Sequence, residues 1–318
     1  MVFIAAPFSL YMGSWGALVG AERLGARCFP FGAGSPGQTR MAVRWIVAAR
    51  PSVFYGTPSF ALYLAETARE DGIDPRADFG FRIMFFSGEP GAGISATKRI
   101  LEETYGARIM DSGSTGEMTP WMSNGECAEA QGMHLWQDIV FTELVDPETK
   151  QVVPYGGEGV PVYTHLERTS QPMIRFWSGD LARWVDEPCP CGRTYPRLPQ
   201  GIYGRVDDMV IIRGENVYPS AVENVVRDVS GFSGEFRMVI TREGAMDELT
   251  VQAEYSDAEA ALAPSNPEAT DALRTLLEER LRTTLGVRVG VELKAPGQLE
   301  RTQFKARRVI DKRPSLRQ

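Results

Sequence analysis

The sequence is 318 residues long, 43% hydrophobic and 24% charged, which is enough for a substantial core and roughly two domains. Its formal net charge of −7 argues against nucleic acid as a partner, because a nucleic-acid-binding face must be basic. No stretch approaches the roughly 20 apolar residues that a membrane helix requires, and Met1–Phe8 lacks the basic leader of a signal peptide. We therefore expect a globular, cytoplasmic protein with no membrane partner.

The first part of the chain alternates short apolar runs with helical patterns, which is typical of parallel α/β units. Met1–Phe8 itself indicates a buried strand. Two further strands and two helices are predicted after it: strands at Val53–Tyr55 and Arg82–Phe86, and helices at Pro58–Asp71 and Ser95–Tyr105. A more β-rich section follows, with strands predicted at Phe141–Asp146, Val160–Thr164 and Met173–Phe176. These elements predict a large α/β domain over residues 1–205.

The pattern changes after Gly204–Asp208. A short strand, Met209–Ile212, precedes a predicted helix, Ala221–Val229, for which Ser220 is the expected N-cap and Glu223 its capping-box partner. The remaining predicted elements are strands Phe236–Thr241 and Leu249–Glu254, helix Glu268–Leu285 and strand Val287–Leu293. This β-α-β-β-α-β order predicts a small α+β domain over residues 206–318.

Three segments contain the most specific motifs of the sequence. The first ends in S-G-D at Asp180, where an aspartate after Ser-Gly is by itself typical of a turn. The second contains C-P-C-G-R-T-Y-P-R-L and, from Gly204, G-R-V-D-D-M-V-I-I-R-G-E-N-V-Y-P. The third is F-K-A-R-R-V-I-D-K-R near the end of the chain. Together they resemble the adenylate-forming superfamily and, within it, the phenylacetate-coenzyme A ligase branch, over essentially the whole chain.

The resemblance implies ATP-dependent activation of an aromatic or arylacetic acid to an acyl-adenylate, followed by transfer of the acyl group to coenzyme A. It implies that Asp180 accepts hydrogen bonds from the ribose hydroxyls and that Arg205 lies near the same sugar and phosphate. Asp207 would be the hinge of a mobile C-terminal domain. Lys305 would stabilise charge on the α-phosphate and the attacking carboxylate; the alternative is a solvated lysine in a basic tail.

The resemblance also implies a nucleotide pocket built from two turns. Ser87–Pro90 follows a predicted strand, and Gly88 would let the backbone approach adenine beside Glu89 and Pro90. The second turn, Asp111–Pro120, reads D-S-G-S-T-G-E-M-T-P.

In the second turn, the resemblance gives Ser114 or Thr115 the phosphate-binding hydroxyl and Glu117 the carboxylate for Mg²⁺. The sequence departs from the family motif there, because its tyrosine is absent and Gly116 lies between Thr115 and Glu117. This departure puts stacking on adenine in doubt. The alternative is a polar loop after a strand.

Four residues have side chains suited to a structural zinc site: Cys127, His134, Cys189 and Cys191. Three thiolates and one imidazole can complete the tetrahedral coordination that Zn²⁺ prefers. The alternative is that the cysteines are simply buried, since C-x-C is tighter than the usual C-x-x-C. The fourth cysteine, Cys28, has no partner in this pattern, and we expect it to be buried.

An acid-binding pocket is expected near the start of the chain, with five aromatic candidates whose alternative role is core packing: Phe8, Tyr11, Trp15, Tyr55 and Phe86. Nothing in the sequence identifies the acid.

The Ser/Thr/Gly-rich phosphate loop of adenylate-forming enzymes is missing from the sequence. We expect either a fragment, or mis-called start, of a complete ligase, or a short homologue that binds a nucleotide or acyl ligand without catalysis. A carrier protein or an amine could replace coenzyme A as acceptor. The expected partners are small molecules (the acid, ATP and coenzyme A), and a homodimer is left open.

Overall fold

The computed structural model describes residues 1–32, 37–113, 115–118, 122–243, 246–262, 267–301 and 308–313. Its contacts divide the chain into two compact units: the first comprises Met1–Val206 and the second begins at Asp207. Across the described ranges, no helix combines the length and apolar character needed to cross a bilayer.

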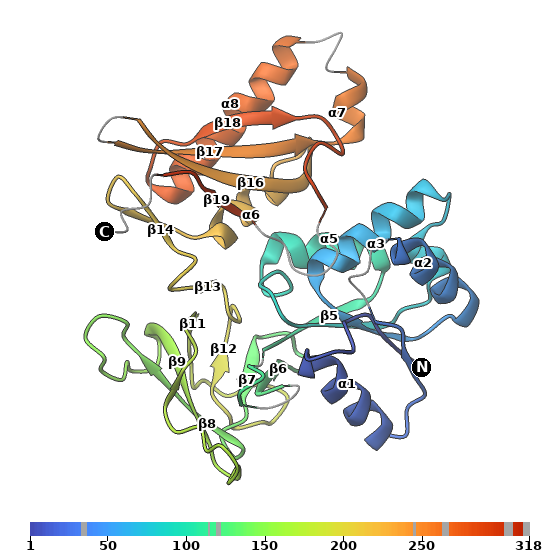
Figure 1. The fold of residues 1–318 in the computed structure, drawn as a ribbon, viewed down its shortest axis with the longest axis vertical. Coiled ribbons are helices and arrows are strands. Elements are labelled where there is room, and N and C mark those ends of the chain that lie inside the picture. The colour runs from blue at the N-terminus through green and yellow to red at the C-terminus, as the bar shows by residue number, and fades with distance from the viewer. Residues whose placement is uncertain are drawn as a thin grey trace. The chain divides into compact units, whose positions relative to one another are not determined.

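An eight-stranded sheet forms the centre of the first unit (Figure 1). Five strands pair in parallel with one another. Each of the remaining three pairs antiparallel with the neighbouring strand that precedes it in the chain. In spatial order they are β12 (Arg197–Leu198), β7 (Met133–Leu135), β6 (Asn124–Glu126), β5 (Arg108–Gly113), β4 (Ile83–Phe86), β3 (Val53–Gly56), β1 (Val2–Ile4) and β2 (Cys28–Pro30).

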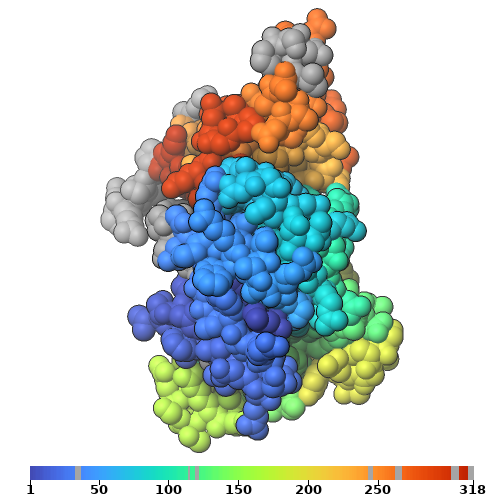
Figure 2. Space-filling view, turned by 90° about the vertical axis from the view of Figure 1, so that its right-hand side faces the viewer, coloured from blue at the N-terminus to red at the C-terminus, as the bar shows by residue number. Residues whose placement is uncertain are grey.

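Helices cover both faces of this sheet because successive strand side chains point to opposite sides. Helix α1 (Met12–Arg23) packs on the face that carries Ile4 and Tyr55. Three helices pack on the face that carries Phe3 and Phe54: α2 (Gln38–Ala49), α3 (Pro58–Glu70) and α5 (Ser95–Tyr105). Figure 2 shows α2 and α3, in blue to cyan, as the outer surface over this second face. A short helix, α4 (Pro75–Asp78), follows α3.

A second sheet holds the β-rich section of the first unit. Its path is β10 (Phe176–Trp177), β9 (Glu158–His165), β11 (Asp180–Arg183) and β13 (Gly204–Arg205), and β8 (Val140–Val145) also pairs with β9. All of these pairings are antiparallel. The chain leaves this sheet after β11, adds β12 to the first sheet, and returns as β13.

The second unit has its own sheet and its own core of aliphatic side chains. Its four strands are β18 (Gly290–Lys294), β17 (Met246–Tyr255), β16 (Phe232–Glu243) and β19 (Val309–Asp311), with helices α6 (Pro219–Asp228), α7 (Asp257–Leu262) and α8 (Pro267–Leu285). A hairpin of β14 (Val210–Ile212) and β15 (Glu215–Val217) precedes α6. The predicted fold class, a large α/β part followed by a small α+β part, is confirmed.

The start of α6 differs from the prediction. The helix begins at Pro219 with Tyr218 as its N-cap, so Ser220 lies inside the first turn. Proline suits the first helical position because its missing N–H would have no partner there. The Glu223 carboxylate accepts a bond from Arg227 Nε at 2.9 Å.

Candidate active site

A cavity of about 640 Å³ opens at the carboxyl ends of the parallel strands of the first unit. This is the edge at which ligands bind in open α/β sheets. Its walls come from the segments after β1, β4 and β5 and from the β-rich section: residues 10–13, 87–90, 111–113, 115–117, Met133, Arg168, Gln171, Met173, Asp180, Ile202 and Arg205.

The turn after β4 supplies one wall of the cavity. Ser87 N donates to the carbonyl of Gly56 at 3.1 Å, which holds the turn against the end of β3. Gly88 has φ +94°, a conformation that residues with a side chain rarely adopt. The Glu89 carboxylate accepts a hydrogen bond from Ser59 N at 2.7 Å, at the start of α3. All three predicted residues of this turn, Gly88, Glu89 and Pro90, line the cavity.

Asp180 and Arg205 form an ion pair on another wall. They are register partners of the antiparallel strands β11 and β13, and Arg205 Nη1 lies 3.1 Å from Asp180 Oδ1. The residue between Ser178 and Asp180 is Gly179, at φ +76°, and a Cβ atom there would lie 3.1 Å from Arg205 Nη2. The S-G-D motif therefore has a local cause: the positive φ favours glycine, and a side chain there would crowd the Arg205 guanidinium.

The loop after β5 forms a third wall. Thr115 and Glu117 both line the cavity, and Glu117 is exposed. Arg168, from the segment after β9, donates through Nη1 to the carbonyl of Glu117 and lines the same cavity. A guanidinium and a carboxylate thus border one space, which suits a ligand that carries both phosphate oxygens and a cation.

Asp111, at the end of β5, is a buried acid that also borders the cavity. The pKa of Asp111 is raised to about 8, chiefly by burial and also by the Glu126 carboxylate, while Lys98 opposes the rise. Lys98 Nζ pairs with Glu126 Oε2 at 2.8 Å, and Asp111 N donates to the same carboxylate at 3.0 Å. Sequence reasoning gave Asp111 no role, because Lys98 and Glu126 lie far from it in the chain.

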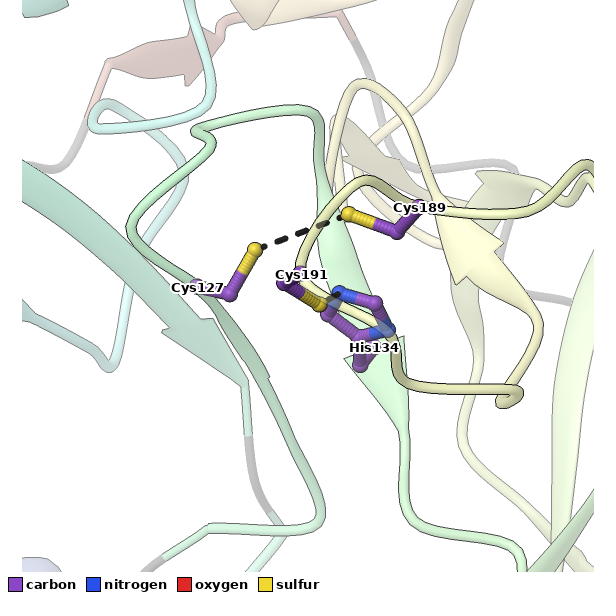
Figure 3. A group of neighbouring side chains, drawn as sticks. All are labelled: Cys127, His134, Cys189 and Cys191. Atoms are coloured by element: carbon purple, nitrogen blue, oxygen red, sulfur yellow. Dashed lines mark hydrogen bonds between the residues drawn. The ribbon is translucent and has the colours of Figure 1, made fainter.

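The three cysteines and the histidine of the predicted zinc site come together beside this wall (Figure 3). Their ligand atoms all lie within 4.8 Å of one another. Cys127 Sγ lies 3.7 Å from Cys189 Sγ, and Cys191 Sγ lies 3.5 Å from His134 Nε2. Cys127 and His134 flank the β6–β7 turn, whereas Cys189 and Cys191 lie in the loop between β11 and β12. Cys28 stands apart on β2, and it is half-buried rather than buried.

Two of the three pKa shifts in this cluster suit metal binding; the exception is Cys127, where burial raises the pKa of the thiol. Burial lowers the pKa of His134, assisted by Arg193 and Arg197, so its imidazole is neutral near pH 7. The backbone N–H of Arg193 lowers the pKa of Cys191 to about 7, and the Arg193 side chain adds to the effect. Metal ligands must be deprotonated thiolates or neutral imidazoles.

The profile of the family described as "AMP-binding enzyme C-terminal domain" matches residues 214–313. The phenylacetate-coenzyme A ligase of Thermus thermophilus is 35% identical to the chain, over 98% of this chain and 71% of that protein. The chain belongs to the phenylacetate-coenzyme A ligase family. These proteins are AMP-forming acid–CoA ligases, so the predicted family is confirmed.

Solved structures of acid–CoA ligases agree with this membership. A 2-hydroxyisobutyryl-CoA ligase in the postadenylation state, in complex with R3-HIB-AMP, matches with a TM-score of 0.93 and 55% identity, over 98% of this chain and 65% of that chain. The chain therefore spans about two thirds of that ligase. A benzoate CoA ligase from Burkholderia xenovorans matches with a TM-score of 0.63 and 20% identity, over 93% of this chain and 58% of that chain, which shows the shared fold.

Three ligase residues predicted from the sequence are not placed at the cavity by the described residues. Ser114 and Lys305 lie outside the described residues. Asp207 is the first residue of the second unit, directly at the division between the two units.

Of the five aromatic candidates for an acid pocket, only Tyr11 lines the cavity. Phe86 is a core residue that packs against Phe54, with ring centroids 5.8 Å apart, so the alternative of core packing is correct for it. Phe8 packs edge-on against Trp15.

Proposed function

We propose that this chain forms the adenylate-binding part of an AMP-forming ligase that converts a carboxylic acid to its coenzyme A thioester. In the first step, a carboxylate oxygen of the acid attacks the α-phosphorus of ATP and pyrophosphate leaves. In the second, the thiol of coenzyme A attacks the acyl carbon and AMP leaves. The observation that carries the proposal is the Asp180–Arg205 pair, which lines the same cavity as the turn at Gly88 in a ligase-family fold.

The roles proposed for the cavity residues follow from their chemistry. Asp180 would accept hydrogen bonds from the two ribose hydroxyls, with Arg205 holding its carboxylate ionised. The turn at Gly88–Pro90 would lie against adenine, where a glycine allows close approach of the backbone. Thr115 would donate its hydroxyl to phosphate.

Magnesium is the ion expected to accompany ATP, and Glu117 is the carboxylate proposed to hold it. Mg²⁺ prefers oxygen ligands and usually takes only one or two carboxylates from the protein, completing its shell with phosphate oxygens and water. The exposed Glu117 on the cavity wall supports this role. Ser114 would offer a further hydroxyl.

The cluster of Cys127, His134, Cys189 and Cys191 is proposed to hold a structural zinc ion. A tetrahedral site with bonds of about 2.3 Å to sulfur and 2.0 Å to nitrogen has edges of roughly 3.8 Å between sulfurs and 3.5 Å between sulfur and nitrogen. The measured Sγ–Sγ distance of 3.7 Å and Sγ–Nε2 distance of 3.5 Å fit those edges. With four protein ligands the site would be closed, which indicates a structural rather than a catalytic ion.

The two half-reactions are proposed to use two orientations of the second unit about Asp207. Lys305 would reach the α-phosphate and the acid carboxylate during adenylation only. The position of Asp207 at the division of the two units supports a hinge there.

The acid is proposed to be either an arylacetate or a short branched hydroxy acid. Family membership favours the first. The second is favoured by the 2-hydroxyisobutyryl-CoA ligase, which is 55% identical to this chain over the aligned region, and by the cavity wall, where Tyr11 is the one predicted aromatic present. The complete ligase should be assayed for AMP release with ATP, coenzyme A and either phenylacetate or 2-hydroxyisobutyrate, because the present sequence lacks the phosphate loop and this chain alone is expected to be inactive. AMP release with neither acid, across a wider acid panel, would count against the ligase proposal.

Two other readings of the site are tested by the same assay. If acyl-adenylate forms but no thioester follows with coenzyme A, the acceptor is a carrier protein or an amine. If nucleotide binds and no adenylate forms, the protein is a non-catalytic binder. The presence of Asp180, Arg205 and Glu117 on the cavity wall favours the catalytic reading, because loss of catalysis would be expected to relax such residues.

A further inference from the structure

The residues proposed to contact ribose lie at the two ends of a long excursion of the chain. Asp180 begins β11, and Arg205 ends β13 after the chain has crossed to the other sheet and returned. Midway, Arg197 pairs with His134 where β12 joins β7. Whatever fixes this excursion therefore also fixes the separation and angle of the ion pair.

The side chain of Arg197 joins two loops that are distant in sequence. It is 6% exposed, and its Nη1 donates to the carbonyl of Gln131 at 2.6 Å while its Nη2 donates to the carbonyl of Glu187 at 3.0 Å. Gln131 lies in the β6–β7 turn between Cys127 and His134. Glu187 lies just before Cys189. The guanidinium thus bridges the same two loops that supply the two halves of the cysteine–histidine cluster.

The geometry of a guanidinium explains why arginine suits this place. Its planar fork presents two N–H donors in a fixed orientation, so bonds to two carbonyls set the spacing of both loops at once. An ammonium group is a compact point charge on a flexible stem, and it cannot hold both carbonyls in that orientation. The backbone of Arg197 is also fixed, because it exchanges two hydrogen bonds with Val185, at 2.8 and 2.9 Å.

Close packing connects the β6–β7 turn and β12 to residues at the cavity. At Gly132, in the β6–β7 turn, a Cβ atom would lie 2.4 Å from the carbonyl oxygen of Leu198 at the end of β12. The chain then runs to Gly201, where a Cβ would lie 2.6 Å from Asp111 Oδ2. Next to it are Ile202, which lines the cavity, and Tyr203, whose N–H donates to Leu181 at 3.2 Å.

We propose that Arg197 is a positioning residue for the nucleotide site. By tying the β6–β7 turn to the loop before β12, it holds β11 and β13 so that Asp180 and Arg205 present one face to the ribose. This inference rests on the proposed function, because it assumes that AMP binds at Asp180. Arg197 itself does not line the cavity.

The test compares AMP binding by titration calorimetry in wild-type protein, Arg197→Lys, Asp180→Ala and the double variant. We expect Arg197→Lys to weaken AMP binding about tenfold, the scale typical of lost supporting contacts. The matched control is Arg183→Lys, which replaces an exposed arginine on β11. This variant should bind AMP with wild-type affinity. In the double variant the two losses should not multiply, because both act through the same contact with ribose.

The outcomes distinguish a failure of the proposed function from a failure of the inference about Arg197. Wild-type protein that binds no AMP overturns the proposed function, and the inference with it. Wild-type binding together with unchanged binding by Arg197→Lys, or with fully multiplicative losses in the double variant, overturns the inference alone. Gly132→Ala is a second variant. Its added methyl group should displace the β6–β7 turn from β12 without a change of charge, and we expect a similar loss of AMP affinity. If neither variant folds, as judged by circular dichroism and thermal unfolding, Arg197 is a folding determinant and the positioning role is rejected.

Discussion

Replacing Asp180 by alanine should damage nucleotide binding far more than it damages folding. In the proposed site, its carboxylate accepts hydrogen bonds from the ribose hydroxyls. Loss of a hydrogen bond to a charged group costs about 1.5–3 kcal/mol, which corresponds to a Kd about 10- to 150-fold higher. We therefore expect the Asp180→Ala variant to bind AMP at least tenfold more weakly than wild type.

The cost to folding should be small because the partner is well hydrated. The side chain of Arg205 is 41% exposed, while that of Asp180 is 13% exposed, so solvent screens the pair. Exposed ion pairs contribute about 0.2–1 kcal/mol, and the alanine variant should lose no more than about this. The expected result is therefore a large change in binding with a small change in the free energy of unfolding.

The assay is AMP titration calorimetry alongside urea unfolding. The control is Asp186→Ala, which replaces an exposed aspartate further along the same segment. It should leave the AMP affinity and the free energy of unfolding unchanged. An Asp180→Ala protein that binds AMP with wild-type affinity would refute the role in ribose binding. A loss of several kcal/mol in stability would instead show that the pair is structural.

Three further predictions address the proposed chemistry. In the complete enzyme, Lys305→Ala should slow ATP–pyrophosphate exchange by about 10²–10³, the usual cost of one preorganised donor, while sparing thioester formation from preformed acyl-adenylate; equal losses in both steps would contradict the two-orientation proposal. Freshly purified protein should contain one zinc per chain by elemental analysis, and Cys189→Ser should lose it while Cys28→Ser keeps it; full zinc in both variants would reject the site. Because the pKa of Asp111 is raised to about 8, its contribution to stability is full below the unfolded pKa of about 3.9 and is lost as the pH rises toward 8. Wild-type protein should therefore lose stability relative to Asp111→Asn between about pH 4 and pH 8 in urea unfolding; parallel curves would show that Asp111 does not titrate in this way.

Sequence reasoning located the elements whose periodicity is strong. Helix Ser95–Tyr105 has the predicted bounds, and the predicted helix Pro58–Asp71 differs by one residue at its end. The strand predicted at Met173–Phe176 begins only at Phe176, because the residues before it form bends in which Arg175 has φ +50°. No helix was predicted at Met12–Arg23, whose buried positions are the small residues Ser14, Ala17 and Ala21, so its apolar stripe is weak.

The parts of the candidate site that belong to a sequence motif were predictable. The S-G-D turn and the turn at Gly88 were named through the family resemblance of their motifs, and the four zinc-type ligands were named from their residue types and spacing. Asp111 and Arg168 were not, because their surroundings depend on tertiary contacts. Asp111 meets Glu126 across the sheet, and Arg168 reaches the carbonyl of Glu117 from the segment after β9. Such contacts leave no periodic or motif signal in a single sequence.

A crystal structure with AMP bound tests the central claim most directly. The account predicts AMP in the cavity of the first unit, with both ribose hydroxyl oxygens within about 3 Å of the Asp180 carboxylate and adenine against the turn at Gly88–Pro90. AMP bound elsewhere on the chain, or bound in this cavity with its ribose away from Asp180, would contradict the account.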